Sequence, residues 1–142
     1  KGAVAIVEAL SMNCLNKLHC LNLDENGIGN LGAIALARVL NNKNIFLKHI
    51  DLNKNRIGNA GACALANSLK VNKTLNEIHL DYNKIGNPGV LALKGAVEMN
   101  HSLYWIGWGD HLLHIDPSVV AFQSVFEREE RKRMRKTECR FY

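Results

Sequence analysis

The apolar and polar residues of this chain follow one pattern three times over. The three copies begin at Leu18, Leu47 and Leu75 and span residues 18–40, 47–69 and 75–97, so their period is almost constant. A weaker fourth copy begins one further period on, at Leu103. A fixed period in this range is typical of a solenoid, in which each unit buries its apolar face against its neighbours.

The first half of each copy predicts a short strand. Leucine or isoleucine alternates with polar residues there, as at Leu21 and Leu23 or at Ile50 and Leu52. A period of two indicates a strand with one buried face. The second half spaces its apolar residues as an amphipathic helix does, and its many alanines allow the helix to lie close to the strand layer. Each copy is therefore expected to be one strand followed by one helix.

Three residue types recur between the strand and the helix of each copy. An asparagine stands where the strand ends, and its short amide can satisfy backbone groups at the corner, so we expect a ladder of stacked Asn side chains. An isoleucine two residues later is expected to fill the core under the loop. Glycines before and within the helix fit a tight turn that enters the helix. These residues are Asn26, Asn55 and Asn83; Ile28, Ile57 and Ile85; and Gly29, Gly58 and Gly86 with Gly32, Gly61 and Gly89.

The motif L-x-x-L-x-L-x-x-N-x-I-G, followed by G-A-x-A-L-A-x-x-L, resembles the ribonuclease-inhibitor-like subfamily of leucine-rich repeat proteins. The resemblance is strong over residues 18–100 and partial over residues 2–10 and 103–111. It implies an α/β fold, namely a right-handed horseshoe solenoid with parallel strands on the concave face and helices on the convex face. In that family, protein partners usually bind at the concave face and its rims.

We expect one domain made of three parts. Residues 1–17 resemble the helical half of a repeat whose strand half is absent, which suggests a piece of a longer repeat protein. Residues 18–102 hold three leucine-rich repeats, and residues 103–142 a degenerate last repeat, a capping helix and a basic tail. Asp116 and Pro117 fit the start of that helix. Its apolar stripe would be Val119, Phe122, Val125 and Phe126, while Trp108 is expected to face the core.

Composition excludes several classes of protein. No apolar run reaches the roughly 18 residues of a membrane span. The four cysteines, Cys14, Cys20, Cys63 and Cys139, form neither a C-x-x-C pair nor a disulfide framework, so we expect free thiols and a reducing, cytoplasmic compartment. The chain lacks a phosphate-binding loop, a nucleophile elbow and a zinc-protease motif. We therefore predict that it is not an enzyme and needs no cofactor.

Equal template positions stack across parallel strands, so the sequence also predicts the residues of the concave face. Its four rows are His19, Lys48, Asn76, Tyr104; Cys20, His49, Glu77, Trp105; Asn22, Asp51, His79, Gly107; and Asp24, Asn53, Asp81, Gly109. The fourth row, with Asp51 beside it, is acidic although the whole chain is basic. His49, His79 and Cys20 could lie close together, but they do not all come from one row and lack a fourth ligand, so we predict no metal site.

We predict that a protein partner binds this concave face. Tyrosine and tryptophan dominate the energetics of many interfaces, which makes Tyr104 and Trp105 the leading candidates. The alternative is that these two aromatic residues pack beneath the C-terminal segment. The full set of candidate contacts is Lys48, His49, Asp51, Glu77, His79, Asp81, Tyr82, Tyr104 and Trp105.

The C-terminal tail carries much of the positive charge. Residues 127–142 hold seven basic and four acidic side chains, a net charge of +3 out of +5 for the chain. One interpretation is a solvated helix supported by pairs of opposite charge four residues apart. The other is an electrostatic contact with an acidic protein surface, and no groove-reading motif accompanies the charge to favour nucleic acid. The contact residues would be Arg131, Lys132, Arg133, Arg135 and Lys136.

Together these features predict a non-enzymatic scaffold for protein–protein interaction. The setting we favour is a structural subunit of a larger cytoskeletal or ciliary assembly in the cytoplasm. Two alternatives fit leucine-rich repeats of this type. One is the ligand-sensing end of an innate immune receptor, and the other is an activator of a small GTPase.

Overall fold

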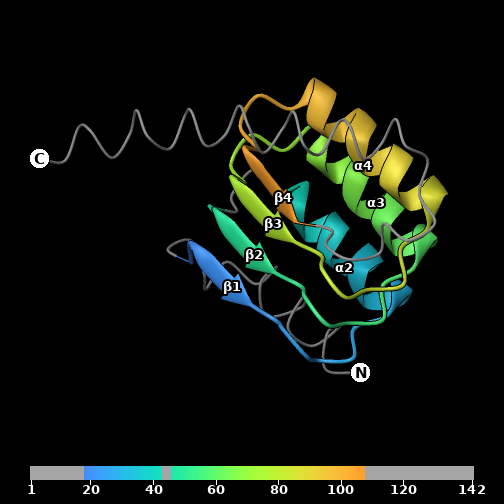
Figure 1. Ribbon diagram of the computed structural model, residues 1–142. Helices are drawn as coiled ribbons and strands as arrows, with labels where there is room; N and C mark the ends of the chain where they lie inside the picture. Colours follow the sequence, from blue (N-terminus) through green and yellow to red (C-terminus); the bar gives the residue numbers. More distant parts are fainter. Residues whose placement is uncertain (1–17, 43–45, 108–142) are drawn as a thin grey trace, which may run out of the picture.

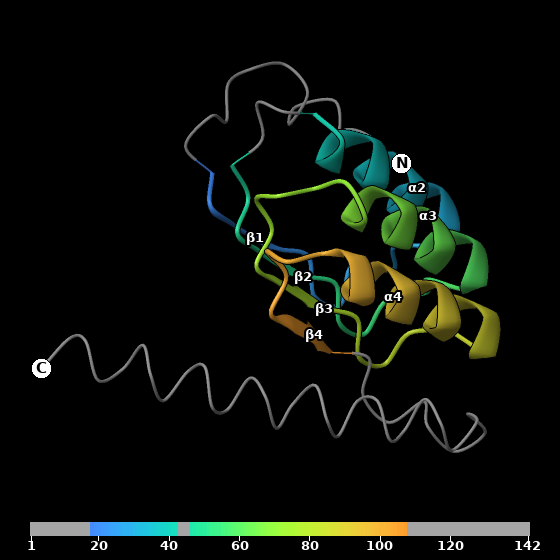
Figure 2. The same cartoon turned by 90° about the horizontal axis from the view of Figure 1, so that it is seen from above.

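Strands and helices alternate along the chain in two layers (Figure 1). The computed structural model describes residues 18–42 and 46–107. Four parallel strands form one sheet in the order β1-β2-β3-β4, and the helices cover one side of it (Figure 2). The elements are β1 (Cys20–Asn22), α2 (Asn30–Leu40), β2 (His49–Asp51), α3 (Asn59–Leu69), β3 (Glu77–His79), α4 (Asn87–Met99) and β4 (Trp105–Gly107). The predicted strand-and-helix unit is thus confirmed in the described part of the chain.

The strand register places equal template positions side by side. Cys20 pairs with His49, His49 with Glu77, and Glu77 with Trp105. The same offset applies to the row that runs from Asn22 on β1 to Gly107 on β4. The rows written from the sequence for these strands are therefore confirmed. The sheet side turned away from the helices, with the loops that leave its strands, is called the strand face below.

One continuous apolar core lies between the sheet and the helices. Leu52, Leu65 and Leu80 are fully buried, as expected for side chains that lie between the sheet and the helices. Ile28, Ile57 and Ile85, the isoleucines under the loops, are 5%, 0% and 4% exposed, which confirms their predicted place in the core. Each repeat buries its apolar side chains against the next, as a solenoid requires.

Asparagine side chains close the corner after each strand. Asn55 is 6% exposed, and its amide makes four hydrogen bonds, two of them to the previous repeat. Its Nδ2 donates to the carbonyl oxygens of Leu23 (2.9 Å), Leu52 (3.0 Å) and Asn53 (2.8 Å), and its Oδ1 accepts from the backbone N–H of Ile28 (2.7 Å). Asn83 repeats this arrangement one unit later. The predicted ladder is confirmed for Asn55 and Asn83. Asn26 is exposed, and among the described residues its side chain donates only to the carbonyl oxygen of Asp24.

A second asparagine ladder, which we did not predict, lies at the opposite edge, where each helix returns to the next strand. Asn72 donates through Nδ2 to the carbonyl oxygen of Leu40 at 2.8 Å, and its Oδ1 accepts from the N–H of Leu75 at 2.8 Å. Asn100 holds the same place one repeat later, with Nδ2 donating to the carbonyl oxygens of Leu69 and Asn72. Both edges of the repeat stack are therefore tied by buried amides.

Each of the helices α3 and α4 is capped by the repeat before it. The residues at the N-cap positions of these helices are glycines, which have no side chain to accept a hydrogen bond. Instead, Oδ1 of Asn30 accepts from the N–H groups of Gly58 (2.7 Å) and Gly61 (3.1 Å) at the start of α3. Asn59 does the same for α4. The first turn of a helix has unpaired N–H groups that need such acceptors, so this contact locks neighbouring repeats together.

The explanation of the glycines by a tight turn is wrong. Gly58 has φ −104° and ψ −168°, an extended backbone that other residues adopt as easily. Close packing explains the glycine inside each helix: a Cβ on Gly61 would lie 2.8 Å from Cγ2 of Ile57 and 3.0 Å from Cβ of Ala33. The left-handed backbone occurs elsewhere in the described part, at Gly27 and at three non-glycine residues of the loops.

Several predictions fall on residues outside the described part. They are the helical half-repeat of residues 1–17, the core position of Trp108, the capping helix and the basic tail. The limits of the three predicted parts also stay predictions.

Candidate functional site on the strand face

Polar and aromatic side chains cover the strand face. Along β2 and β3 the central isoleucines, Ile50 and Ile78, are fully buried in the core. The residues that flank them alternate to the other side of the sheet and are half-buried. Seven of the nine candidate contacts lie on the strands or on the residue before them, and the other two, Asp81 and Tyr82, lie in the loop after β3. The sheet therefore holds the candidate residues together on one surface.

A carboxylate stands between two histidines at the centre of this face. Oε2 of Glu77 lies 2.9 Å from Nδ1 of His49 on the neighbouring strand β2. The same oxygen lies 3.7 Å from Nε2 of His79, two residues further along β3. Period-two alternation puts Glu77 and His79 on the same side of the sheet, and the parallel register sets His49 directly beside Glu77. We call these three residues the His–Glu–His cluster.

The surroundings of Glu77 favour its charged form. Partial burial by itself would raise the pKa of this carboxyl group, because a charge loses solvation inside a protein. The hydrogen bonds to His49 and Tyr104, and the charges of His49 and His79, outweigh that effect and lower the pKa below its usual value. Glu77 is therefore ionised at neutral pH and holds its neighbours in a fixed arrangement.

The two aromatic residues at the C-terminal side of the face are held in place. Tyr104 forms a side-chain hydrogen bond with Glu77. Trp105 is half-buried, and its ring lies 6.2 Å from that of His79 at an angle of 38°. Nε1 of Trp105 is buried without a hydrogen-bond partner among the residues that the structure describes. Both aromatic residues thus adjoin the His–Glu–His cluster, and both keep part of their surface exposed.

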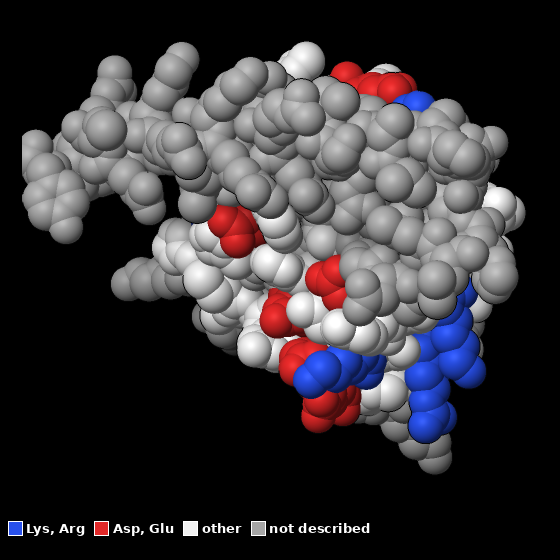
Figure 3. Space-filling model, viewed as in Figure 1, with Lys and Arg blue, Asp and Glu red and all other residues white. Residues whose placement is uncertain are grey.

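Carboxylates gather where the strands end. The acidic strip is defined here as Asp24, Glu25, Asp51 and Asp81, and Figure 3 shows acidic side chains running along this part of the strand side. One lysine lies among them: Nζ of Lys54 is 2.5 Å from Oε1 of Glu25 and 4.0 Å from Oδ2 of Asp24. The hydrogen bond and charge of Glu25, with the charge of Asp24, raise the pKa of Lys54. The strip therefore already binds one ammonium group supplied by the neighbouring repeat.

Three loop residues project from the ends of the strands in a strained backbone conformation. Glu25, Lys54 and Tyr82 stand at equal template positions and have φ values of 57°, 48° and 55°. Residues other than glycine rarely adopt this left-handed backbone conformation. Tyr82 is 56% exposed, which is unusual for so large an aromatic side chain. The solenoid therefore presents a different residue from each repeat at the same point of its edge.

The structure describes some of the remaining predicted site features and not others. Lys48 is half-buried in the first row, where its backbone pairs with the neighbouring strands. In residues 18–42 and 46–107, no group of three or more His, Cys, Asp or Glu residues is arranged to hold a metal ion. No helix in the same ranges is long and apolar enough to cross a membrane. Arg131, Lys132, Arg133, Arg135 and Lys136 lie outside the described residues.

A family model described as "Leucine Rich repeat" matches residues 10–37, 43–66 and 71–94. The three matched segments cover more than half of the chain and follow the three repeats of strand and helix. The chain belongs to the leucine-rich repeat family. No curated protein sequence matches it.

Two of the solved structures that resemble this chain illustrate the likeness of fold. One is titled "Leiomodin-1 Actin-Binding Site 2 (ABS2)", with a TM-score of 0.73, 18% sequence identity, and coverage of 97% of this chain and 77% of that one. The other is the tropomodulin C-terminal domain of Caenorhabditis elegans, with a TM-score of 0.58, 13% identity, and coverage of 98% of this chain and 99% of that one. At these identities the likeness concerns the fold.

Sequence reasoning found the rows of this leucine-rich repeat but missed the contacts between them. It considered His49 and His79 as metal ligands, together with Cys20, and overlooked Glu77 between them. The signal was present, because the template puts Glu77 in the same row as His49 and two residues before His79. It also predicted that the fourth row, with Asp51 beside it, is acidic, and it missed that Lys54 reaches the carboxylates there.

Proposed function

We propose that this leucine-rich repeat chain is a non-enzymatic scaffold that binds a protein partner through its strand face. The observation that carries the proposal is the fixed cluster of His49, Glu77 and His79, with Tyr104 and Trp105 beside it. These side chains hold one another through hydrogen bonds, an ion pair and a ring contact. A surface that is ordered before binding loses less entropy when the partner arrives, which favours affinity.

The scaffold beneath this face supports the same conclusion. Asn55 and Asn83 satisfy backbone groups at one edge, and Asn72 and Asn100 do so at the other. The two ladders thus satisfy much of the backbone without the strand-face side chains, although Oδ1 of Asp51 accepts from the N–H of Asn53 at 2.9 Å. We assign Lys48, Asp51, Asp81 and Tyr82 to the same surface.

The partner we propose belongs to the cytoskeleton. One solved structure with a similar fold carries an actin-binding site in its title. Actin is therefore the first protein to test, in a cytoplasmic and cytoskeletal setting. The ciliary setting, the innate immune receptor and the GTPase activator stay predictions from the sequence.

The finer classification is part of the proposal. We assign the chain to the ribonuclease-inhibitor-like subfamily, since each of the three repeats follows its strand with a full α-helix. A right-handed solenoid follows, with the strand face on the concave side and a capping helix formed by residues after 116. We also propose that the basic residues of the tail contact an acidic protein surface.

A binding assay with purified actin and four forms of the chain tests this function. The forms are the unchanged chain, the double variant Glu77→Ala/His79→Ala, and the single variants Arg38→Ala and Glu98→Ala. The last two residues are exposed on helices α2 and α4, away from the strand face, and serve as matched controls. Biolayer interferometry would give each affinity, and circular dichroism would show that every variant is folded.

The proposal expects the double variant to weaken binding about tenfold or more, because central residues of an interface carry most of its free energy. Both helix variants should bind like the unchanged chain. Equal loss in the control variants would remove the strand face as the site. If actin does not bind at all, the same variants applied to proteins captured from a cytoskeletal extract would decide between another cytoskeletal partner and none.

A further inference from the structure

Exposed apolar side chains recur along the edge of the repeat stack where the helices return to the strands. Val71 and Met99 hold equal template positions there and are 65% and 62% exposed. Phe46, which directly precedes the buried Leu47 at the start of the second repeat, is 47% exposed. Single exposed apolar residues are common, whereas several along one edge indicate an interaction surface. The return edge is defined here as Phe46, Lys70, Val71, Lys73 and Met99.

The asparagine ladder at this edge fixes the backbone that carries the apolar residues. Val71 and Met99 each directly precede a ladder residue, Asn72 or Asn100, whose own side chain is buried. Oδ1 of Asn72 accepts from the N–H of Leu75 at 2.8 Å, and Asn100 makes the equivalent bond one repeat later. The two apolar side chains therefore project from an ordered edge, and the packing of the core does not explain them.

Cations accompany the apolar residues of the return edge. Lys70 and Lys73 lie on either side of Val71 along the chain and are exposed. The described residues that connect each helix to the next strand contain no carboxylate. One exposed carboxylate, Glu98, stands at the end of helix α4, and Lys94 precedes it by one helical turn, a spacing at which opposite charges attract. The return edge is therefore both apolar and basic.

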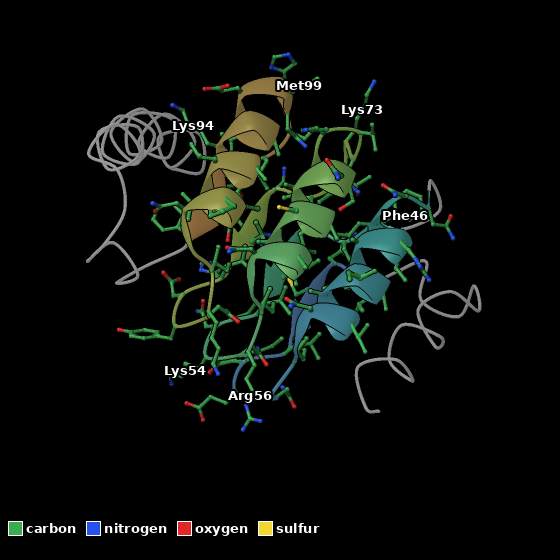
Figure 4. All side chains as sticks on the ribbon, turned by 90° about the vertical axis from the view of Figure 1, so that its right-hand side faces the viewer. Phe46, Lys54, Arg56, Lys73, Lys94 and Met99 are labelled. Atoms are coloured by element: carbon green, nitrogen blue, oxygen red, sulfur yellow. The ribbon has the colours of Figure 1, made fainter. Side chains whose placement is uncertain are left out.

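The carboxylates of the acidic strip lie at the other end of the strands. Each strand begins on the side of the return edge and ends on the side of the acidic strip. Figure 4 shows Phe46, Lys73 and Met99 toward one side of the molecule and Lys54 and Arg56 at the opposite one. An orientation that turns the return edge toward an anionic surface therefore keeps the acidic strip away from it, which avoids repulsion between like charges.

We propose that the return edge docks this chain on the surface of an anionic lipid membrane. Its three apolar side chains would enter the boundary between headgroups and acyl chains, and its two lysines would contact the headgroups. Lipids close around side chains that project from separate repeats, whereas a protein partner would need a matching hollow for each. Docking of this kind needs no membrane-spanning helix. It leaves the strand face open, so it goes beyond the proposed function and does not rest on it.

The test measures how tightly full-length chains bind vesicles, by co-sedimentation. The vesicles consist of phosphatidylcholine, either alone or with about one third of phosphatidylserine, which supplies the negative charge. In the neutral-tail chain, the five cations of residues 131–136 are replaced by glutamine, so that attraction of the basic tail to the vesicles is removed. Every variant is built on this neutral-tail chain, and circular dichroism would show that each is folded.

The first variants test the apolar contact. Val71→Ser/Met99→Ser removes two apolar side chains of the return edge. Its matched control, Leu31→Ser/Leu91→Ser, removes two from helices α2 and α4 that are 80% and 54% exposed. The edge variant should bind the anionic vesicles about tenfold more weakly or less, because binding grows with the apolar area that enters the membrane. The control should bind like the neutral-tail chain, and so should Val71→Leu/Met99→Leu, which keeps the apolar surface.

The second pair of variants tests the charge. Lys70→Gln/Lys73→Gln should weaken binding to the anionic vesicles more than tenfold, since each cation near such a surface contributes about fivefold. Arg56→Gln/Lys84→Gln removes two exposed cations just before helices α3 and α4, at the other end of the helix layer, and should change binding little. Vesicles of phosphatidylcholine alone should bind the neutral-tail chain about tenfold more weakly than the anionic ones.

Three outcomes would overturn the proposal. If the neutral-tail chain does not bind anionic vesicles, a protein partner remains as the occupant of the return edge. If edge variants and controls lose binding equally, the vesicles adsorb the chain without using this edge. If only the lysine variant weakens binding, the apolar residues do not enter the membrane. The proposed function can fail separately, because Glu77→Ala/His79→Ala should leave vesicle binding unchanged whatever its effect on actin.

Discussion

Removing one buried amide should test whether the asparagine ladder holds the repeats together. In Asn55→Ala, four hydrogen bonds are lost, but two of the acceptors keep another donor. The carbonyl oxygen of Leu52 also accepts from Nδ2 of Asn83 at 2.8 Å, and that of Asn53 from the N–H of Glu25 at 3.2 Å.

Two backbone groups are then left without the partner that the structure shows. They are the carbonyl oxygen of Leu23 and the N–H of Ile28, which both bond to Asn55. A buried polar group without a partner costs about 1–3 kcal/mol, so Asn55→Ala should lower the free energy of unfolding by about 2–6 kcal/mol. That is a large share of the roughly 5–15 kcal/mol by which a folded domain is stable.

Asn26→Ala is the matched control, because Asn26 holds the same template position but is exposed. Among the described residues, its side chain makes a single hydrogen bond, to the carbonyl oxygen of Asp24. Its effect should stay within about 0.5 kcal/mol, as for other surface substitutions. Urea unfolding followed by circular dichroism gives both values, provided the dependence on denaturant is unchanged. If the two variants are equally stable, the buried ladder does not stabilise the fold and the reasoning fails.

Three further predictions use the same unfolding assay. Gly61→Ala should lower stability by about 1–3 kcal/mol because its new methyl group has no room in the packed helix layer, whereas Gly95→Ala, with nothing within 4 Å of the added carbon, should be neutral or slightly stabilising. Asn59→Ala should cost about 0.5–2 kcal/mol, the usual loss for a helix cap, although it lies in a different helix from the one it caps. Glu77 has a lowered pKa, so its contribution is complete above the usual value of 4.5 and is lost as the pH falls through the lower folded-state value. Glu77→Gln should remove part of the pH dependence of stability below about pH 4.5, and an unchanged profile would contradict the ion pair with His49.

The sequence predicted the architecture because the same pattern of buried and polar positions recurs in each repeat. Leu52 and Leu80 mark the buried face of the strands, and the constant period fixes the parallel register, since each strand is displaced by one repeat from the last. The row containing His49 and Glu77 follows directly from that displacement. Repetition thus supplies the long-range information that a single strand or helix lacks.

The contacts that the sequence did not reveal are those that a side chain makes with another repeat. Asn30 caps a helix that begins one repeat later, so its role is invisible in its own helix, where asparagine is an ordinary surface residue. The misreading of Gly58 has a similar cause. Its backbone is extended, and the Cβ of an alanine there would lie only 3.3 Å from Oδ1 of Asn30. A recurring residue in a repeat protein therefore needs to be read against the neighbouring copy as well as its own.

These neighbour contacts separate the residues that hold the fold from those available for binding. The asparagine ladders satisfy backbone groups at the edges of the repeat stack, and the caps do so at the starts of the helices. The isoleucines fill the core between the sheet and the helices. None of these contacts uses the outward side chains of β2 and β3, so those positions are free to differ between repeats, and they do. His49 and Glu77 occupy equal template positions, one with a basic and the other with an acidic side chain, and they bind each other. A uniform scaffold can therefore carry a non-uniform surface, and a partner that reads several repeats at once would recognise this chain by the order of its strand-face residues.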